Sequence, residues 1–244
     1  MFNSSQAVLL LAAALPLVMV MAGPLERRIY RSNPSTGLKF VAYGGNIVLL
    51  WAMAAAAVGV EGWGRLLQSP APSKSWLWAP VVTKPVLAAA VGAYMLVALL
   101  PLFQSLRGPR WRRAYAAAYR RGFAEIAGML PNTALERAAW ALLSLTAGVC
   151  EELYFRGFLI RVLQERGPEL PLAAALVVSS LIFGLGHLYQ GAKGVLGTTI
   201  GGAGFGLLFL LTGSLIPGVV LHALIDLQIA YVLTPGREET AAIA

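Results

Sequence analysis

Side chains that can perform acid–base chemistry stand inside three long apolar segments of this sequence. They are Glu151, Glu152 and Arg156 in the first segment, His187 in the second, and His222 and Asp226 in the third. An ionised side chain in hydrocarbon is costly unless it has a partner or a water-filled cavity, so such residues are functional candidates by default. The two histidines are the only ones in the chain. We therefore expect these residues to form one site assembled from three helices.

The composition is that of an integral membrane protein. Apolar residues make up 58% of the chain and charged residues 12%, whereas a soluble domain has about 25% charged residues. Several runs reach the roughly 20 apolar residues that cross a bilayer as a helix, and the weak two-residue alternation argues against a barrel. The sequence predicts an all-α, polytopic helical membrane protein with about seven to eight transmembrane helices.

The basic residues predict the topology of these helices. We expect helices over residues 6–24, 41–60, 81–105, 133–165, 170–188, 194–212 and 214–233. The net charge of +8 comes largely from clusters after the first and third helices, Arg27, Arg28, Arg31 and Lys39, and then Arg107, Arg110, Arg112, Arg113, Arg120 and Arg121. Because positive charge marks cytoplasmic loops, the protein is predicted to be a multi-pass cell-membrane protein with its N-terminus outside and its C-terminus cytoplasmic. The charge is thereby explained without a nucleic-acid partner.

Three regions are expected along the chain. Residues 1–132 hold the N-terminal transmembrane helices and end in a basic segment over 110–128, which is either an interfacial helix or a loop that fixes topology. Residues 133–233 form the core that carries the site, opened by a capping box from Thr133 to Glu136. Residues 234–244 are a polar tail. Arg161 and Lys84, near helix ends, are expected to extend to the membrane surface.

Helical spacing assigns separate tasks to the two adjacent glutamates. Glu152 and Arg156 are four residues apart on one face, in the favourable order for an ion pair. Glu151 points about 100° away from Glu152 on an ideal helix, which leaves it free to act as a base or a metal ligand. The turn at Gly167 and Pro168 folds the next helix back, so His187 should face Glu151 at a similar depth. A purely structural ion cluster is the alternative.

Two mechanisms suit this set of residues. In the first, Zn²⁺ is held by ligands drawn from Glu151, His187, His222 and Asp226 and lowers the pKa of its water. In the second, Glu151 and His187 activate water directly, while His222 and position 226 stabilise the oxyanion. An ionised Asp226 repels an oxyanion, so the aspartate favours a metal or a role in orienting His222. Cys150, the only cysteine, excludes an internal disulfide and a cysteine-based metal site.

Three motifs, taken together, resemble those of the CPBP family of intramembrane proteases: Glu151-Glu152 with Arg156, Phe183 with His187, and His222 with Asp226. This group is related to the CAAX prenyl endopeptidase of the Rce1 type and to bacteriocin-processing and immunity proteins. The motifs stand in the family's order over about residues 133–233, with Asp226 where Asn is common. The resemblance implies an endopeptidase that cuts a peptide or prenylated protein near the cytosolic membrane face. It implies catalytic roles for Glu151, Glu152, His187, His222 and Asp226, by a metallo- or glutamic-type mechanism.

Two other classes of function remain as alternatives. A non-catalytic membrane immunity or regulatory partner would keep the polar cluster as a packing device. A small proton-coupled carrier would use the glutamates and histidines as a relay, although the sequence lacks the paired inverted repeats expected of one. Other intramembrane protease classes fit poorly, because the sequence has no Gly-x-Ser-Gly, no His-Glu-x-x-His and only one intramembrane aspartate.

Overall fold

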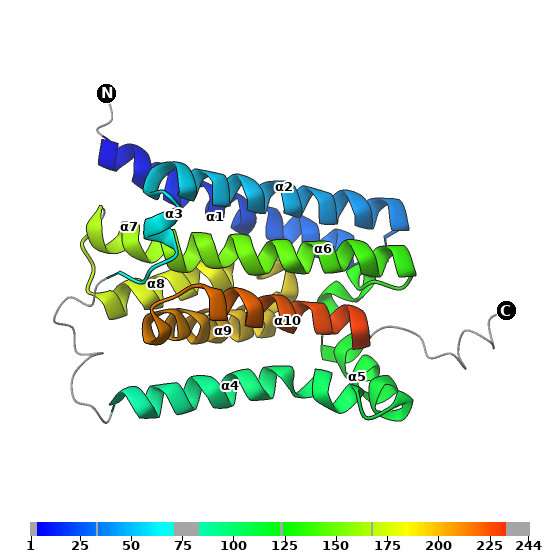
Figure 1. Ribbon diagram of the computed structural model, residues 1–244. Helices are drawn as coiled ribbons and strands as arrows, with labels where there is room; N and C mark the ends of the chain where they lie inside the picture. The colour runs from blue at the N-terminus through cyan, green and yellow to red at the C-terminus, as the bar shows by residue number, and fades with distance from the viewer. Residues whose placement is uncertain (1–3, 33, 71–82, 123, 167, 233–244) are drawn as a thin grey trace.

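The computed structural model describes residues 4–32, 34–70, 83–122, 124–166 and 168–232, which form a bundle of helices (Figure 1). Within these ranges there is no β-strand beyond an isolated bridge between Gln68 and Ser214. The elements are α1 Ser4–Arg31, α2 Thr36–Glu61, α3 Trp63–Leu66, α4 Thr83–Ser105, α5 Pro109–Gly122, the 3₁₀ helix η2 Ala124–Met129, α6 Ala134–Glu151, the π-helix η3 Glu152–Leu159, α7 Ile160–Glu165, α8 Leu172–Leu185, the 3₁₀ helix η4 Leu188–Gln190, α9 Gly191–Thr212 and α10 Ile216–Val232. The all-α prediction is confirmed.

Length and apolar composition identify the membrane spans. Four helical runs can cross a bilayer, namely Ala7–Arg31, Thr36–Glu61, Pro85–Ser105 and Leu188–Thr212, and α8 and α10 are shorter apolar helices. Helix α6 continues through η3 into α7 as one helical run. These segments follow the predicted order, and the chain is a multi-pass helical membrane protein. The predicted tail over 234–244 lies outside the described residues.

Helix α6 lies at the centre of the bundle, and the other long helices are arranged around it. It packs against α2 on one side and α10 on the other, and α4 lies beyond α10 (Figure 1). Helices α6 and α10 approach closely at Gly148, where an added Cβ would lie 2.9 Å from both Cβ and N of Ala223 and 3.0 Å from the carbonyl oxygen of Val219. Two of these three atoms belong to the α10 backbone, so α10 itself would have to move to accommodate a side chain.

We therefore expect Gly148→Ala to destabilise the protein by about 1–3 kcal/mol, the usual cost of overpacking. The matched control is Gly59→Ala in α2, where nothing lies within 4 Å of the added Cβ. That change should be neutral or stabilise the helix by up to about 1 kcal/mol, because alanine is the better helix former. Thermal unfolding in one detergent measures both variants. Equal midpoints would contradict the close approach of α6 and α10.

The start of α6 is fixed as its sequence predicts. Thr133 and Glu136 form a capping box, in which each side chain accepts a hydrogen bond from the other residue's backbone N–H. Glu136 also accepts from Thr36 at 2.6 Å and pairs with Lys39 at 3.0 Å. Lys39 is only 2% exposed, so this member of the predicted cytoplasmic cluster is buried within the bundle. This buried ion pair instead joins α2 to α6.

The basic segment after α4 was predicted to be either a helix or a loop, and it is a helix. Helix α5 has no buried residue and carries arginines at both ends. The η2 turn that follows is tied back to α1, because Arg27 and Arg31 both pair with Glu125. Hydrogen bonds from these two guanidinium groups hold the pKa of the Glu125 carboxyl at about 2, so this clasp is ionised at any physiological pH.

At the opposite end of the bundle, the position of Arg161 contradicts a further prediction. Arg161 does not extend to the membrane surface: it is 7% exposed and donates to the backbone carbonyls of Arg65 and Gln68 and to the Glu165 carboxylate. Arg65 also pairs with Glu61 at 2.6 Å. A long cation can stay buried here because backbone carbonyls and a carboxylate satisfy its donors. The network fastens the segment after α2 to α7.

Candidate active site

The two adjacent glutamates lie where α6 changes into a π-helix. Glu151 is the last residue of α6, and Glu152 begins the eight-residue π-helix η3, all of which is buried. Short π-helical stretches in α-helices are frequent at functional sites. The sequence predicted one continuous helix over 133–165, and the helical run is confirmed, but its i→i+4 pattern had no feature that would reveal this change of winding.

The predicted ion pair between Glu152 and Arg156 is present. Arg156 Nη1 lies 3.0 Å from Glu152 Oε1, and the two side chains are 2% and 0% exposed. The guanidinium also stands over the Phe183 ring, 4.4 Å from its centre, and donates to the Gly202 carbonyl at 3.2 Å. Arginine suits this position because its planar, weakly hydrated group can pair and stack at once. The pair therefore joins η3 to both α8 and α9.

Glu152 has a second partner, His222 of α10, which sequence spacing did not reveal. His222 Nδ1 lies 2.8 Å from Glu152 Oε1. A carboxylate paired with arginine can only accept hydrogen bonds, so Nδ1 of His222 carries the proton and donates. Phe205 stacks on the imidazole with centroids 4.9 Å apart. The position and the tautomer of His222 are thus both set by its neighbours.

The other nitrogen of His222 faces two carboxylates. Its Nε2 lies 3.6 Å from Glu151 Oε2 and 3.8 Å from Asp226 Oδ2. Both distances exceed a direct N–H···O hydrogen bond. Glu151 Oε2 is buried, and no residue in the described part of the chain donates a hydrogen bond to it. A small molecule such as water is the natural occupant of this gap between polar groups.

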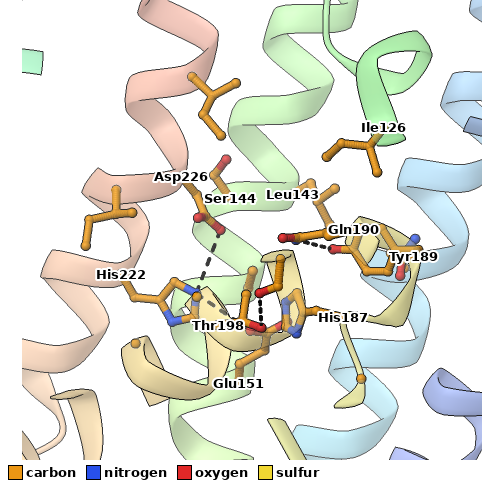
Figure 2. A pocket seen from close by; sticks show the side chains of 18 of the residues that line it. Ile126, Leu143, Ser144, Glu151, His187, Tyr189, Gln190, Thr198, His222 and Asp226 are labelled. Carbon is orange, nitrogen blue, oxygen red and sulfur yellow. Dashed lines mark hydrogen bonds and ion pairs between the residues drawn. The ribbon is translucent and has the colours of Figure 1, made fainter. Parts of the chain in front are cut away.

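His187 lies just beyond the end of α8, in the turn that leads to η4, and it is 8% exposed. Its Nδ1 is 2.8 Å from the Phe183 carbonyl oxygen, which can only accept, so Nδ1 carries the proton and Nε2 is left as an acceptor. Figure 2 shows Glu151, His187, His222 and Asp226 directed into one pocket. Their expected convergence from separate helices is present.

Comparison with known proteins adds to this geometry. Residues 133–228 match the family described as Type II CAAX prenyl endopeptidase Rce1-like. This part of the chain is similar to the Rce1-like family. The predicted resemblance is confirmed over these residues, which include every predicted site residue and less than half of the chain. This match supports endopeptidase activity in the membrane as the general function. No curated protein and no solved structure matches the chain.

The Rce1-like segment does not form the pocket alone. The cavity has a volume of about 570 Å³, and the N-terminal helices supply much of its wall. Their polar contributions are Glu26, Tyr30, Tyr43, Asn46, Tyr94 and Tyr119. Sequence analysis did not identify these residues as part of the site. Asn46 and Tyr94 were detectable only as single polar side chains within apolar spans, a weak signal compared with paired glutamates.

The four predicted zinc ligands are Glu151, His187, His222 and Asp226. Within the described ranges, no three His, Cys, Asp or Glu side chains are gathered in a way that could hold a metal ion. The donor set as placed does not fit a zinc site. A mechanism built from these residues alone uses no metal, and zinc binding is the alternative that metal removal tests.

Proposed function

We propose that this protein is an intramembrane endopeptidase in which Glu151 activates water for attack on a peptide bond. The observation that carries the proposal is the position of Glu151 Oε2. It is buried in a pocket among membrane helices, accepts no hydrogen bond from the described residues, and lies 3.6 Å from His222 Nε2. A general base needs this combination of an available acceptor and a fixed position beside the reacting group.

The proposed reaction begins with water held between Glu151 and His187 Nε2. Glu151 takes one proton as the water oxygen attacks the carbonyl carbon, and the carbonyl oxygen becomes an oxyanion. Glu151 then gives that proton to the amide nitrogen, and the C–N bond breaks. The products are a carboxylic acid and an amine, so the atoms of one water molecule are fully accounted for. His187 acts as an acceptor that orients the water.

His222 supports the other side of the reaction. Its Nδ1–H donates to Glu152, which is paired with Arg156. When its Nε2 is protonated, His222 donates a hydrogen bond to the oxyanion and supplies a positive charge where negative charge develops. Asp226, 3.8 Å from that nitrogen, favours the protonated ring. In this scheme the aspartate acts through His222 and not as an oxyanion donor, in line with the expectation from its charge.

The residues that line one part of the cavity support cleavage near the cytosolic face. Tyr119 and Gly122 of the basic helix α5, together with Lys193, line the cavity. By the positive-inside rule, the arginines of α5 belong on the cytoplasmic side, which supports a cytosolic location for this part of the cavity. We propose a peptide segment at this face as the substrate, either a CAAX-type prenylated C-terminus or a peptide precursor.

Cleavage of defined peptides by the purified protein tests the proposal. The assay compares wild type with Glu151→Ala in lipid nanodiscs, using a farnesylated CAAX peptide and the same peptide without the lipid. Products identified by mass should carry one heavy oxygen in the new carboxyl group when the reaction runs in heavy-oxygen water. If folded wild type cuts neither a CAAX peptide nor any of a panel of membrane-peptide precursors, the result would favour the alternative function, a non-catalytic membrane immunity or regulatory partner.

Metal removal gives a separate prediction. Because the side chains as placed do not fit a zinc site, we expect phenanthroline or EDTA to leave the cleavage rate unchanged, and added zinc to leave it unchanged after dialysis. Elemental analysis of the same sample should find no stoichiometric metal. Loss of activity with the chelator, restored by zinc, would contradict the water-activation scheme and support the alternative in which Glu151, His187, His222 and Asp226 supply ligands.

A further inference from the structure

Tyr94 of α4 is a pocket residue outside the Rce1-like segment. Its side chain crosses two glycines of α9. A Cβ added to Gly201 would lie 2.9 Å from the Tyr94 hydroxyl oxygen, and one added to Gly204 would lie 3.3 Å from the ring. The hydroxyl therefore reaches the α9 backbone at a point where any side chain larger than glycine would block it.

This point on α9 is next to the catalytic cluster. Gly202, the following residue, accepts a hydrogen bond from Arg156. Phe205, one helical turn beyond Gly201, stacks on His222. Tyr94, Gly201, Phe205 and His222 all line the same cavity. The Tyr94 hydroxyl thus enters the pocket within one turn of the ring that covers His222.

The Tyr94 hydroxyl differs from other hydroxyls of the pocket in its hydrogen bonding. Thr198 donates to the Gly194 carbonyl at 2.8 Å, Ser144 to the Trp140 carbonyl at 2.9 Å, and Tyr43 to the Met129 carbonyl. None of the residues that the structure describes makes a hydrogen bond with the Tyr94 hydroxyl. Its proton is therefore available to a ligand in the cavity.

The chemistry of the site needs such a donor. A tetrahedral intermediate is stabilised by hydrogen-bond donors aimed at its oxygen. Asp226 cannot donate when it is ionised, and among the predicted residues this leaves His222 as the donor to that oxygen. Tyrosine is suited to the task, because its hydroxyl is neutral at physiological pH and extends from a rigid ring with few rotatable bonds.

We propose that the Tyr94 hydroxyl is a catalytic hydrogen-bond donor to the substrate carbonyl oxygen, so that α4 completes the site of the Rce1-like segment. The inference rests on the proposed peptidase function. The hydroxyl keeps its proton throughout, and its hydrogen bond strengthens as the carbonyl oxygen becomes an oxyanion. It therefore contributes chiefly to the transition state and not to binding of the intact peptide.

Gln228 of α10 holds α4 in the register that this contact requires. Its Nε2 donates to the Ala98 carbonyl at 2.9 Å, and its Oε1 accepts from the Leu102 N–H at 3.2 Å. Ala98 and Leu102 are four residues apart, next to Pro101, and Tyr94 precedes Ala98 by four residues on the same face. Gln228 is 3% exposed and lies two residues after Asp226. We assign it as the positioning residue for Tyr94.

The test measures kcat, KM and the affinity of a peptide phosphinate, which imitates the tetrahedral intermediate. Tyr94→Phe should lower kcat by about 10²–10³-fold, the usual effect of losing one oxyanion donor, and leave KM unchanged. Phosphinate affinity should fall in parallel, while affinity for the uncleaved peptide stays the same. The variant should fold, because the hydroxyl has no protein partner to lose. Gln228→Leu should lower kcat by a smaller factor, with little further loss when combined with Tyr94→Phe.

Two other tyrosines provide matched controls. Tyr231 has an exposed side chain on α10 outside the cavity, and Tyr154 donates to the Ala12 carbonyl in the core. Tyr231→Phe should change nothing, and Tyr154→Phe should lower stability while kcat is kept. Wild-type kcat in Tyr94→Phe, beside an inactive Glu151→Gln, would overturn this inference and leave the peptidase proposal in place. Equal cleavage by Glu151→Gln would overturn the role of Glu151 as the base, and absence of cleavage by folded wild type would overturn the peptidase proposal itself.

Discussion

Glu151→Gln should lower kcat for peptide cleavage by about 10²–10⁴-fold, the range that a positioned general base contributes. Glutamine has nearly the same shape and keeps an oxygen toward the pocket, but its amide cannot take the proton from water. The variant should fold at least as well as wild type, since it removes a buried charge that has no hydrogen-bond partner among the described residues. Initial rates and thermal unfolding of the same preparation give both quantities.

A second buried carboxylate, at the other end of the bundle, is a control that distinguishes a catalytic role of Glu151 from the general effect of removing a buried negative charge. Glu61 is also buried, at 7% exposure, but it pairs with Arg65 and Arg166. Glu61→Gln should reduce stability and leave kcat unchanged. If Glu151→Gln instead cleaved at the wild-type rate and unfolded at a lower temperature, the glutamate would be a structural residue and another group would have to activate the water.

The helical fold and the members of the site were predictable because each depends on a local pattern. Long apolar runs marked the helices, and the Thr133 to Glu136 spacing marked the start of α6. Charges in apolar spans cost so much that they identified Glu151 and His187 without any structure. The turn after the long helix then predicted that these two would share one pocket, and both line it.

The contacts between distant segments were not predictable from such patterns. Lys39 looked like one more cytoplasmic cation, yet it is buried against Glu136, which lies 97 residues away. Glu152 had an adequate partner in Arg156, so nothing in the spacing pointed to His222, 70 residues further on. Tyr94 carries no charge and stands alone in an apolar span. Pairing across the bundle depends on helix packing, which single-helix periodicity does not encode.

Arg156→Met should destabilise the protein by about 3–5 kcal/mol, the usual cost of leaving a buried charge without its partner. Glu152 is 0% exposed, and one of its oxygens lies where a Cβ on Gly218 would be 3.3 Å away, so water has little access to replace the guanidinium. Methionine fills much of the space above Phe183, which limits the loss of packing. Unfolding in mixed micelles, followed by far-ultraviolet circular dichroism, measures the change.

A double variant distinguishes the effect of this ion pair on stability from its effect on catalysis. In Glu152→Gln/Arg156→Met both charges are gone, and replacing a buried pair by neutral groups is often close to neutral for stability. We therefore expect the double variant to recover most of the stability lost in Arg156→Met, a coupling that additive effects cannot produce. It should not recover kcat, because the negative charge that accepts from His222 Nδ1 and holds the imidazole is lost as well. Recovery of both properties would show that Glu152 and Arg156 are a packing device, and that His222 needs no oriented partner.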